Sequence, residues 1–212
     1  AFYQPWLDPT MTYSSALFDD MNEPLERAQE RKYARLAAAL DIQPGDRVLE
    51  IGWGWGGFAE FAASKFDCEI VGLTISTEQA QYARTRMAKA GLADQVDIRL
   101  QDYRDVDGLF DKIVSIEMFE AVGVAHWPIY FDTLRKRLKP GGRAAVQTIT
   151  IEEARFDAYR RTPDFIQHYI FPGGALPSPE RFEERAASQK LSISNARFFG
   201  PSYAETLRRW NT

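Results

Sequence analysis

Residues 47–57 of this sequence read RVLEIGWGWGG, and they carry the most information about the fold. A short aliphatic run that ends in glycine predicts a buried strand leading directly into a glycine-rich loop. Glycines in that position let the backbone approach a ligand closely and present N–H groups at the start of the following helix. The stretch therefore predicts a strand–loop–helix unit that binds a nucleotide-like cofactor.

Strands and helices are expected to alternate on both sides of this unit. Pro24 is placed at the start of a helix, and residues 43–46 are expected to form a turn. After the glycine loop the pattern predicts helices at 57–66, 77–90, 129–138 and 179–189, strands at 69–73, 96–100, 112–116, 143–151 and 191–199, and a helix from 203 to 210. Such alternation is typical of βαβ units, so a doubly wound, mostly parallel α/β sheet is expected.

The chain is expected to form one domain, residues 1–212, in four parts. Residues 1–45 form a loop and a helix that cover the cofactor, and residues 46–151 form the cofactor-binding core. Residues 152–180 interrupt the rhythm with an aromatic, Gly- and Pro-rich insertion that resembles a lid over an acyl pocket. Residues 181–212 form a C-terminal part that is expected to be truncated, because no final antiparallel strand can be found in the pattern.

Composition excludes several classes of function. A net charge of −4 argues against nucleic-acid binding, which needs a basic surface. The single cysteine, Cys68, excludes an intramolecular disulfide and a cysteine zinc cluster, and the histidines have no partner at metal-ligand spacing, so no metal site is expected. The low cysteine content also indicates a reducing, cytoplasmic setting. No apolar run is long enough for a membrane span, so any membrane contact is expected to be peripheral.

The glycine spacing alone does not choose between cofactors, since Gly52, Gly54 and Gly57 also match a dinucleotide pattern. A dinucleotide site would have an acid near the end of the second strand, where this chain has Thr74. Glu50 instead suits the ammonium group of S-adenosylmethionine. Two residues after the next strand suit the adenine, Asp102 for its amino group and Tyr103 for stacking.

Five segments together resemble the cyclopropane-fatty-acid synthase family of class I (Rossmann-like) methyltransferases. They are TYSS at 12–15, IGWGWGG at 51–57, GLTISTEQ at 72–79, MFEAVG at 118–123, and YIFPGG with LPS at 169–178. The resemblance runs in the family's order over essentially the whole chain. It implies that S-adenosylmethionine is bound by Tyr13, Ser14, Gly52, Gly54, Thr74, Gln79, Asp102 and Tyr103, to which Glu50 and Gly56 of the loop are added.

The family's reaction transfers a methyl group to a carbon–carbon double bond and then removes a proton. By resemblance, Glu120 helps to hold a bicarbonate ion that acts as the base, together with Gln147 and Ile149 of the fifth strand. Aromatic faces can stabilise the intermediate cation. Four aromatic residues are therefore expected in the substrate pocket: Trp53, Phe119, Tyr169 and Phe171.

Three positions depart from the family's usual residues. Ala121 and Gln147 stand where histidines are usual, and Trp53 stands where cysteine is usual. The amide of Gln147 can hydrogen-bond an anion but cannot carry a proton. Some branches of the family resemble this version with Ala121 and Gln147, so the changes are compatible with activity, but they leave open how the proton is removed.

The resemblance implies a methyltransferase that acts on unsaturated phospholipid acyl chains at the inner face of the membrane. Cyclopropane and mid-chain methyl or methylene products remain open, and so does a homodimer. Two alternatives are a methyltransferase of the same fold with a small soluble acceptor, and a non-catalytic cofactor- or lipid-binding homologue. A nicotinamide oxidoreductase is disfavoured by Thr74.

Overall fold

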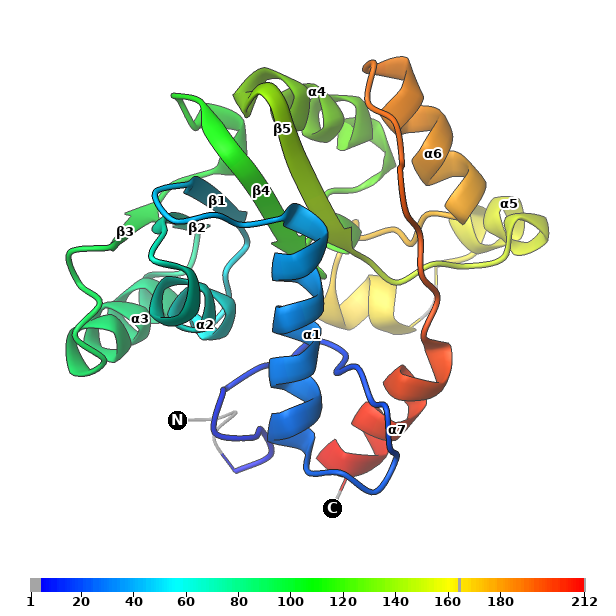
Figure 1. Cartoon of the computed structure of the whole chain (residues 1–212). Coiled ribbons are helices and arrows are strands. Elements are labelled where there is room, and N and C mark those ends of the chain that lie inside the picture. Colours follow the sequence, from blue (N-terminus) through cyan, green and yellow to red (C-terminus); the bar gives the residue numbers. More distant parts are fainter. Residues whose placement is uncertain (1–4, 164, 212) are drawn as a thin grey trace.

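In the computed structural model, which describes residues 5–163 and 165–211, a five-stranded sheet forms the centre of the molecule (Figure 1). All strands pair in parallel in the order β3-β2-β1-β4-β5. Their bounds are β1 Arg47–Ile51, β2 Glu69–Thr74, β3 Val96–Leu100, β4 Phe110–Ile116 and β5 Leu138–Gln147. The predicted parallel α/β sheet is confirmed.

Helices cover both faces of the sheet. One face is covered by α1 (Leu25–Leu40), α2 (Gly57–Phe66) and α3 (Thr77–Lys89), and the other by α4 (Trp127–Arg137) with α6 (Pro179–Ser188) packed against it. Successive residues of each strand serve opposite faces, as strand geometry requires. Two apolar clusters therefore form, which contain Val48 and Ile70 on the first face and Leu49 and Val71 on the second.

The strand order places a crevice between β1 and β4. The order of the strands changes direction at this point: β2 and β3 lie on one side of β1, whereas β4 and β5 lie on the other. Ligands of open α/β sheets bind outside the carboxyl ends of the strands at such a point. Ile51 at the end of β1 is in register with Ser115 near the end of β4. The loops that start at Gly52 and Glu117 therefore leave the sheet beside one another.

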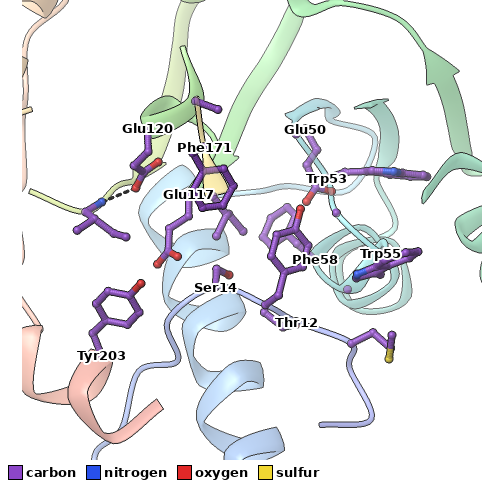
Figure 2. Close-up of a pocket in the computed structure, with 18 of the residues that line it drawn as sticks. Thr12, Ser14, Glu50, Trp53, Trp55, Phe58, Glu117, Glu120, Phe171 and Tyr203 are labelled. Carbon is purple, nitrogen blue, oxygen red and sulfur yellow. Dashed lines mark hydrogen bonds between the residues drawn. The ribbon is translucent and has the colours of Figure 1, made fainter. Parts of the chain in front are cut away.

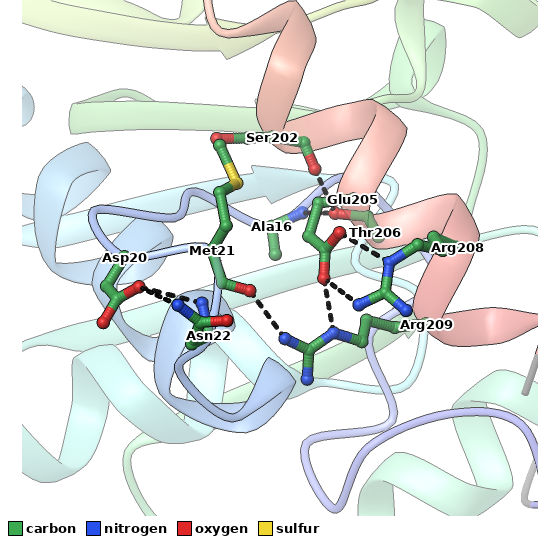
Figure 3. Close-up of polar contacts among 9 residues, drawn as sticks. All are labelled: Ala16, Asp20, Met21, Asn22, Ser202, Glu205, Thr206, Arg208 and Arg209. Carbon is green, nitrogen blue, oxygen red and sulfur yellow. Dashed lines mark hydrogen bonds and ion pairs between the residues drawn. The ribbon is translucent and has the colours of Figure 1, made fainter.

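The N-terminal segment is fastened to the last helix, α7 (Gly200–Trp210). The backbone N–H of Ala16 donates to Oγ1 of Thr206 at 3.0 Å, and that of Phe18 donates to Oγ of Ser202 at 3.1 Å. Arg209 extends the contact to the carbonyl oxygen of Met21 (Figure 3). These bonds join residues that are far apart in the sequence, and they hold the N-terminal segment across the carboxyl edge of the sheet.

Most predicted elements agree with the structure, including the helix starts after Pro24 and at Gly57. Residues 191–199 contradict the prediction, because they run as an extended connection with no strand pairing (Figure 1). Ile193 and Phe198 are exposed on it, so the apolar residues of this segment do not form one buried sheet face.

Three smaller differences concern the end of the sheet and the insertion. β5 ends at Gln147 rather than at 151, because Ile149 turns its N–H toward a side chain instead of a strand. The insertion at 152–180 contains α5 (Glu153–Arg161) and a short π-helical turn (Ile166–Ile170) that were not predicted.

No antiparallel strand occurs within residues 5–163 and 165–211, and none of the helices described there is long and apolar enough to cross a membrane.

Candidate active site

A cavity of about 400 Å³ opens at the carboxyl edge of the sheet, at the crevice between β1 and β4. Its walls come from the N-terminal segment, α1, the glycine loop, the residues after β4, the insertion and α7. Figure 2 shows two chemically different ends. Glu50 and Trp53 lie at the end formed by the glycine loop, and Glu117, Glu120 and Tyr203 lie at the other.

The glycine loop depends on backbone conformations that favour glycine. Gly52 and Gly54 have φ angles of +77° and +57°, in the left-handed region. A Cβ atom built on Gly54 would lie 2.9 Å from the ring of Tyr13, so the loop and the N-terminal segment are in close contact. The N–H groups that follow this loop belong to the first turn of α2. The loop thus has the left-handed glycines and the following helix start that the sequence predicts, while its contact with a cofactor stays a prediction.

Glu50 is a buried carboxylate at the base of this loop. Its side chain is almost fully enclosed, and Oε2 makes no hydrogen bond within the described part of the chain. Burial raises the pKa of Glu50 to about 8, against the opposing effect of the positive charges of Arg86 and Lys32. An enclosed carboxylate without a hydrogen-bond partner is costly unless a cation neutralises it. Glu50 therefore has the environment of a residue that receives a cationic group.

A chain of hydrogen bonds links Tyr13 to β2. The amide of Gln79 donates to the hydroxyl of Tyr13 at 3.1 Å, and the hydroxyl of Thr74 donates to Oε1 of Gln79 at 2.8 Å. Beside Tyr13, Oγ of Ser14 accepts a hydrogen bond of 2.7 Å from the buried ammonium of Lys32. Tyr13 and Ser14 line the cavity, whereas Thr74 and Gln79 support Tyr13 from outside it.

Asp102 and Tyr103 lie further along the same edge of the sheet and do not line the cavity. Gln101, which precedes them, donates its backbone N–H to the carbonyl oxygen of Thr74 at 2.9 Å. Asp102 pairs with Arg104, whose hydrogen bonds lower the pKa of the carboxyl group. Gly56 also lies just outside the lining, although its neighbour Gly57 is part of it. Contact of these residues with a cofactor stays a prediction.

Glu120 and Ile149 meet at the opposite end of the cavity. The backbone N–H of Ile149 donates to Oε1 of Glu120 at 2.5 Å, while Oε2 has no hydrogen-bond partner among the described residues. Burial raises the pKa of Glu120 to about 7, and the charge of Glu117 adds to that rise. The structure therefore brings these two predicted residues together.

Glu117 is a functional candidate that the sequence interpretation missed. It follows β4 directly, lines the cavity, and accepts hydrogen bonds on Oε1 from the amide of Gln147 and from the backbone N–H of Ser15, both at 2.9 Å. Gln147 itself lies behind Glu117 rather than on the cavity wall. Burial raises the pKa of Glu117, which the charge of Lys32 opposes. An acid at the carboxyl end of a parallel strand was the available signal.

Tyr203 of α7 was also missed as a site residue. Its ring lines the cavity, and in Figure 2 its hydroxyl points toward the carboxylate of Glu117. Burial and the charges of Glu117 and Glu120 raise the pKa of Tyr203 to about 12, so the phenol stays protonated at neutral pH. Two acids and one phenol thus converge on the end of the cavity away from the glycine loop.

The four aromatic residues predicted for the substrate pocket have different positions. Phe171 lines the cavity, and so does Trp53, whose indole ring packs directly on Gly72 of β2. Phe119 was placed wrongly: it is fully buried in the cluster under α4, where it stacks on Trp127. Its short 3-10 turn directs Glu120 to the cavity and Phe119 to the opposite side. Tyr169 was also placed wrongly, since it is 74% exposed and does not line the cavity.

The strand order, the glycine loop and the buried acid beneath it define the fold of class I methyltransferases. The mycolic acid cyclopropane synthetase family matches residues 1–212, and the chain belongs to that family.

Two relatives of known name and one solved structure illustrate the relationship. The chain is 45% identical to the tuberculostearic acid methyltransferase UfaA1 of Mycobacterium tuberculosis, over 98% of this chain and 50% of that protein. It is 40% identical to the cyclopropane-fatty-acyl-phospholipid synthase of Escherichia coli, over 96% of this chain and 51% of that protein. The mycolic acid cyclopropane synthase CmaA1, solved with SAH and CTAB, superposes with a TM-score of 0.92 at 32% identity and covers 99% of this chain and 76% of that one. The chain spans about half the length of these two curated relatives.

Proposed function

We propose that this chain is the catalytic part of an S-adenosylmethionine-dependent methyltransferase that acts on the double bond of an unsaturated fatty-acyl chain. The observation that carries the proposal is a single cavity with a buried, unpartnered carboxylate at its glycine-loop end and two further carboxylates at the other. The family membership and the names of its relatives support the same reaction class.

The glycine-loop end fits the cofactor. Glu50 would neutralise the ammonium group of its methionine part, and the loop would allow close approach of its backbone through Gly52 and Gly54. Tyr13 and Ser14 would form the adjoining wall, with Thr74 and Gln79 holding Tyr13 in place, and Asp102 and Tyr103 would receive the adenine. The structure of CmaA1, solved with SAH, supports the binding of such a cofactor. Bound S-adenosylmethionine supplies an electrophilic methyl group.

The opposite end suits an acyl chain. Ile149, Tyr159, Ile166, Phe171 and Leu176 contribute apolar wall, so water can be excluded from the reacting double bond. An alkene is a weak nucleophile, and holding it against the methyl donor in dry surroundings supplies much of the rate enhancement. The residues needed for this step bind and orient the chain rather than react with it.

Phospholipids at a membrane surface are the proposed source of the acyl chain. Phe165, Ile166, Tyr169, Ile170 and Phe171 expose apolar side chains on the insertion, close to the cavity wall to which Ile166 and Phe171 belong. The relative from Escherichia coli is named for a fatty-acyl-phospholipid substrate. Peripheral association with the inner membrane face and a homodimer stay predictions.

The test uses the full-length protein that carries this chain, vesicles of unsaturated phospholipid, and S-adenosylmethionine. Calorimetry is expected to detect cofactor binding, and mass spectrometry is expected to detect acyl chains that have gained one carbon. Ozone then separates the two products, because it cleaves a surviving double bond but not a cyclopropane ring. Methylation of a small polar acceptor with none on lipid would instead favour the soluble-acceptor alternative, and the absence of cofactor binding would contradict both.

A further inference from the structure

The bicarbonate ion that the family resemblance implies does not fit the acidic end of this cavity. The two donors expected to hold such an anion are both engaged by protein carboxylates. The amide Nε2 of Gln147 donates to Glu117, with a second contact of 3.2 Å to the carbonyl oxygen of Ser15, and the N–H of Ile149 donates to Glu120. An additional anion would have to displace one of these acids.

Charge also opposes an anion at this place. Glu117 and Glu120 are close enough for the charge of Glu117 to raise the pKa of Glu120. A third negative group between two carboxylates in low-dielectric surroundings is unfavourable. Lys32 faces Glu117 from α1, but its ammonium is directed to Oγ of Ser14, and its own pKa is lowered to about 7 by burial.

The backbone of Glu117 adopts a conformation that is unusual for a residue with a Cβ atom. Glu117 has a φ angle of +49°, in the left-handed region where glycine is favoured over residues with a Cβ. Non-glycine residues in that conformation are strained and cluster at functional sites. The side chain of Glu117 is fixed by two hydrogen bonds to Oε1, and its carboxylate lies at the cavity wall.

We propose that Glu117 is the proton acceptor of the reaction, a fixed carboxylate that takes the place of the exogenous bicarbonate. The inference rests on the proposed function and names the base for it. Gln147 and Ser15 then position that base. Position 147 therefore needs only a hydrogen-bond donor, and an amide can serve there in place of a residue that carries a proton.

The chemical step balances without any further reactant. The π electron pair of the alkene forms the new bond to the methyl carbon, while the bond from that carbon to the sulfonium sulfur breaks and leaves its pair on sulfur. The other alkene carbon becomes a cation. Glu117 then accepts a proton from a carbon next to that cation or from the new methyl group. The C–H electron pair forms a double bond or closes the ring, and Glu117 later returns the proton to water.

The test compares two variants of the full-length protein in buffer freed of carbon dioxide. Glu117→Gln keeps the shape but cannot accept a proton, and turnover on unsaturated phospholipid vesicles is expected to fall by about 100-fold or more. Glu117→Gly relieves the backbone and releases the donors of Ser15 and Gln147. Glu117→Gly is expected to be equally slow in that buffer but to recover activity when bicarbonate or formate is added. Glu117→Gln is expected to show no such recovery.

A matched control separates the chemistry from the glycine substitution. Lys190 is an exposed residue with a φ angle of +62°, and Lys190→Gly is expected to leave turnover unchanged. The inference is overturned if wild-type turnover needs added bicarbonate, if Glu117→Gln remains active, or if a folded Glu117→Gly variant is not rescued by either anion.

The behaviour of the wild-type protein distinguishes a failure of the Glu117 proposal from a failure of the proposed function. A wild-type protein that binds S-adenosylmethionine but modifies no acyl chain would contradict the proposed function, and the role of Glu117 with it. A wild-type protein that modifies acyl chains, alongside an active Glu117→Gln variant, would contradict only the role of Glu117.

Discussion

Gln147 at the end of β5 donates a hydrogen bond of 2.9 Å to Glu117, which follows the neighbouring strand β4. The backbone makes the reverse contact, since the N–H of Glu117 donates to the carbonyl oxygen of Gln147 at 2.8 Å. The two residues therefore form one unit at the carboxyl edge of the sheet. The amide at position 147 is thus matched to the acid at position 117.

Loss of the amide at position 147 is expected to shift the pH dependence of turnover. The hydrogen bond from Gln147 favours the ionised form of Glu117, so Gln147→Ala raises the pKa of Glu117 further. Because the base must be ionised, the acid limb of the kcat profile moves to higher pH. Lys32, Tyr203 and Glu120 face the same acid and are unchanged in this variant. An identical pH profile for the two proteins, measured on lipid vesicles, would contradict the link.

Replacement of Glu50 by glutamine is expected to separate stability from cofactor binding. The folded protein keeps a proton on Glu50 up to a pKa of about 8, whereas the unfolded chain releases it near 4.5. The free energy of unfolding of the wild type therefore falls as the pH rises through this window. Glu50→Gln removes that loss, so its Tm is expected to exceed that of the wild type above pH 8 but not near pH 4.5.

The same Glu50→Gln variant is expected to bind S-adenosylmethionine at least about tenfold more weakly, because the ammonium loses its counter-charge. Thermal unfolding and calorimetry measure the two effects. Unchanged affinity would show that Glu50 does not receive the cation.

A methyl group at Gly54 is expected to damage the cofactor cradle. Gly54→Ala strains the left-handed backbone and places a Cβ 2.9 Å from the ring of Tyr13. Gly45→Ala is the matched control: its φ angle is +82°, but nothing lies within 4 Å of the added atom. Both variants should lose about 1–2 kcal/mol of stability from the backbone, while only Gly54→Ala should weaken cofactor binding. Equal affinities of the two variants by calorimetry would argue against a cradle at this loop.

The contact between the N-terminal segment and α7 is expected to contribute to stability. Thr206→Val removes the acceptor of the buried N–H of Ala16, which costs about 1–3 kcal/mol when a buried donor is left unsatisfied (Figure 3). Thr85 provides a matched control. The hydroxyl of Thr85, like that of Thr206, donates to the carbonyl oxygen four residues earlier, but Thr85 is exposed on α3. Thr85→Val should change the free energy of unfolding by no more than about 0.5 kcal/mol. Denaturant unfolding measures both, and equal effects would count against the contact.

Local sequence patterns predicted the parts of the fold that depend on local rules. The run into Gly52 gave the first strand and its loop, and the alternation around it gave the parallel sheet. Glu120 and Ile149 were found through the family resemblance. The strand predicted at 191–199 failed because pairing needs a neighbouring strand, and no local pattern states whether one is present.

The rest of the site depends on which residues meet in space. Glu117, Lys32 and Tyr203 come from three distant parts of the sequence, and the chain brings them together only through the strand order and the packing of α1 and α7. Phe119 and Glu120 are adjacent in the sequence but face opposite sides of a 3-10 turn. A motif identifies both residues without stating which one faces the cavity.

Transfer of a deuterated methyl group is the most direct test of whether the protein methylates acyl chains. The full-length protein is given S-adenosylmethionine with a fully deuterated methyl group and vesicles of unsaturated phospholipid, and the acyl chains are analysed by mass spectrometry. Deuterium is expected in the acyl chains: two deuterium atoms remain when a deuteron leaves the new methyl group, and three remain when a proton leaves a chain carbon. Cofactor binding with no deuterium in any acyl chain would contradict the proposed methylation of acyl chains.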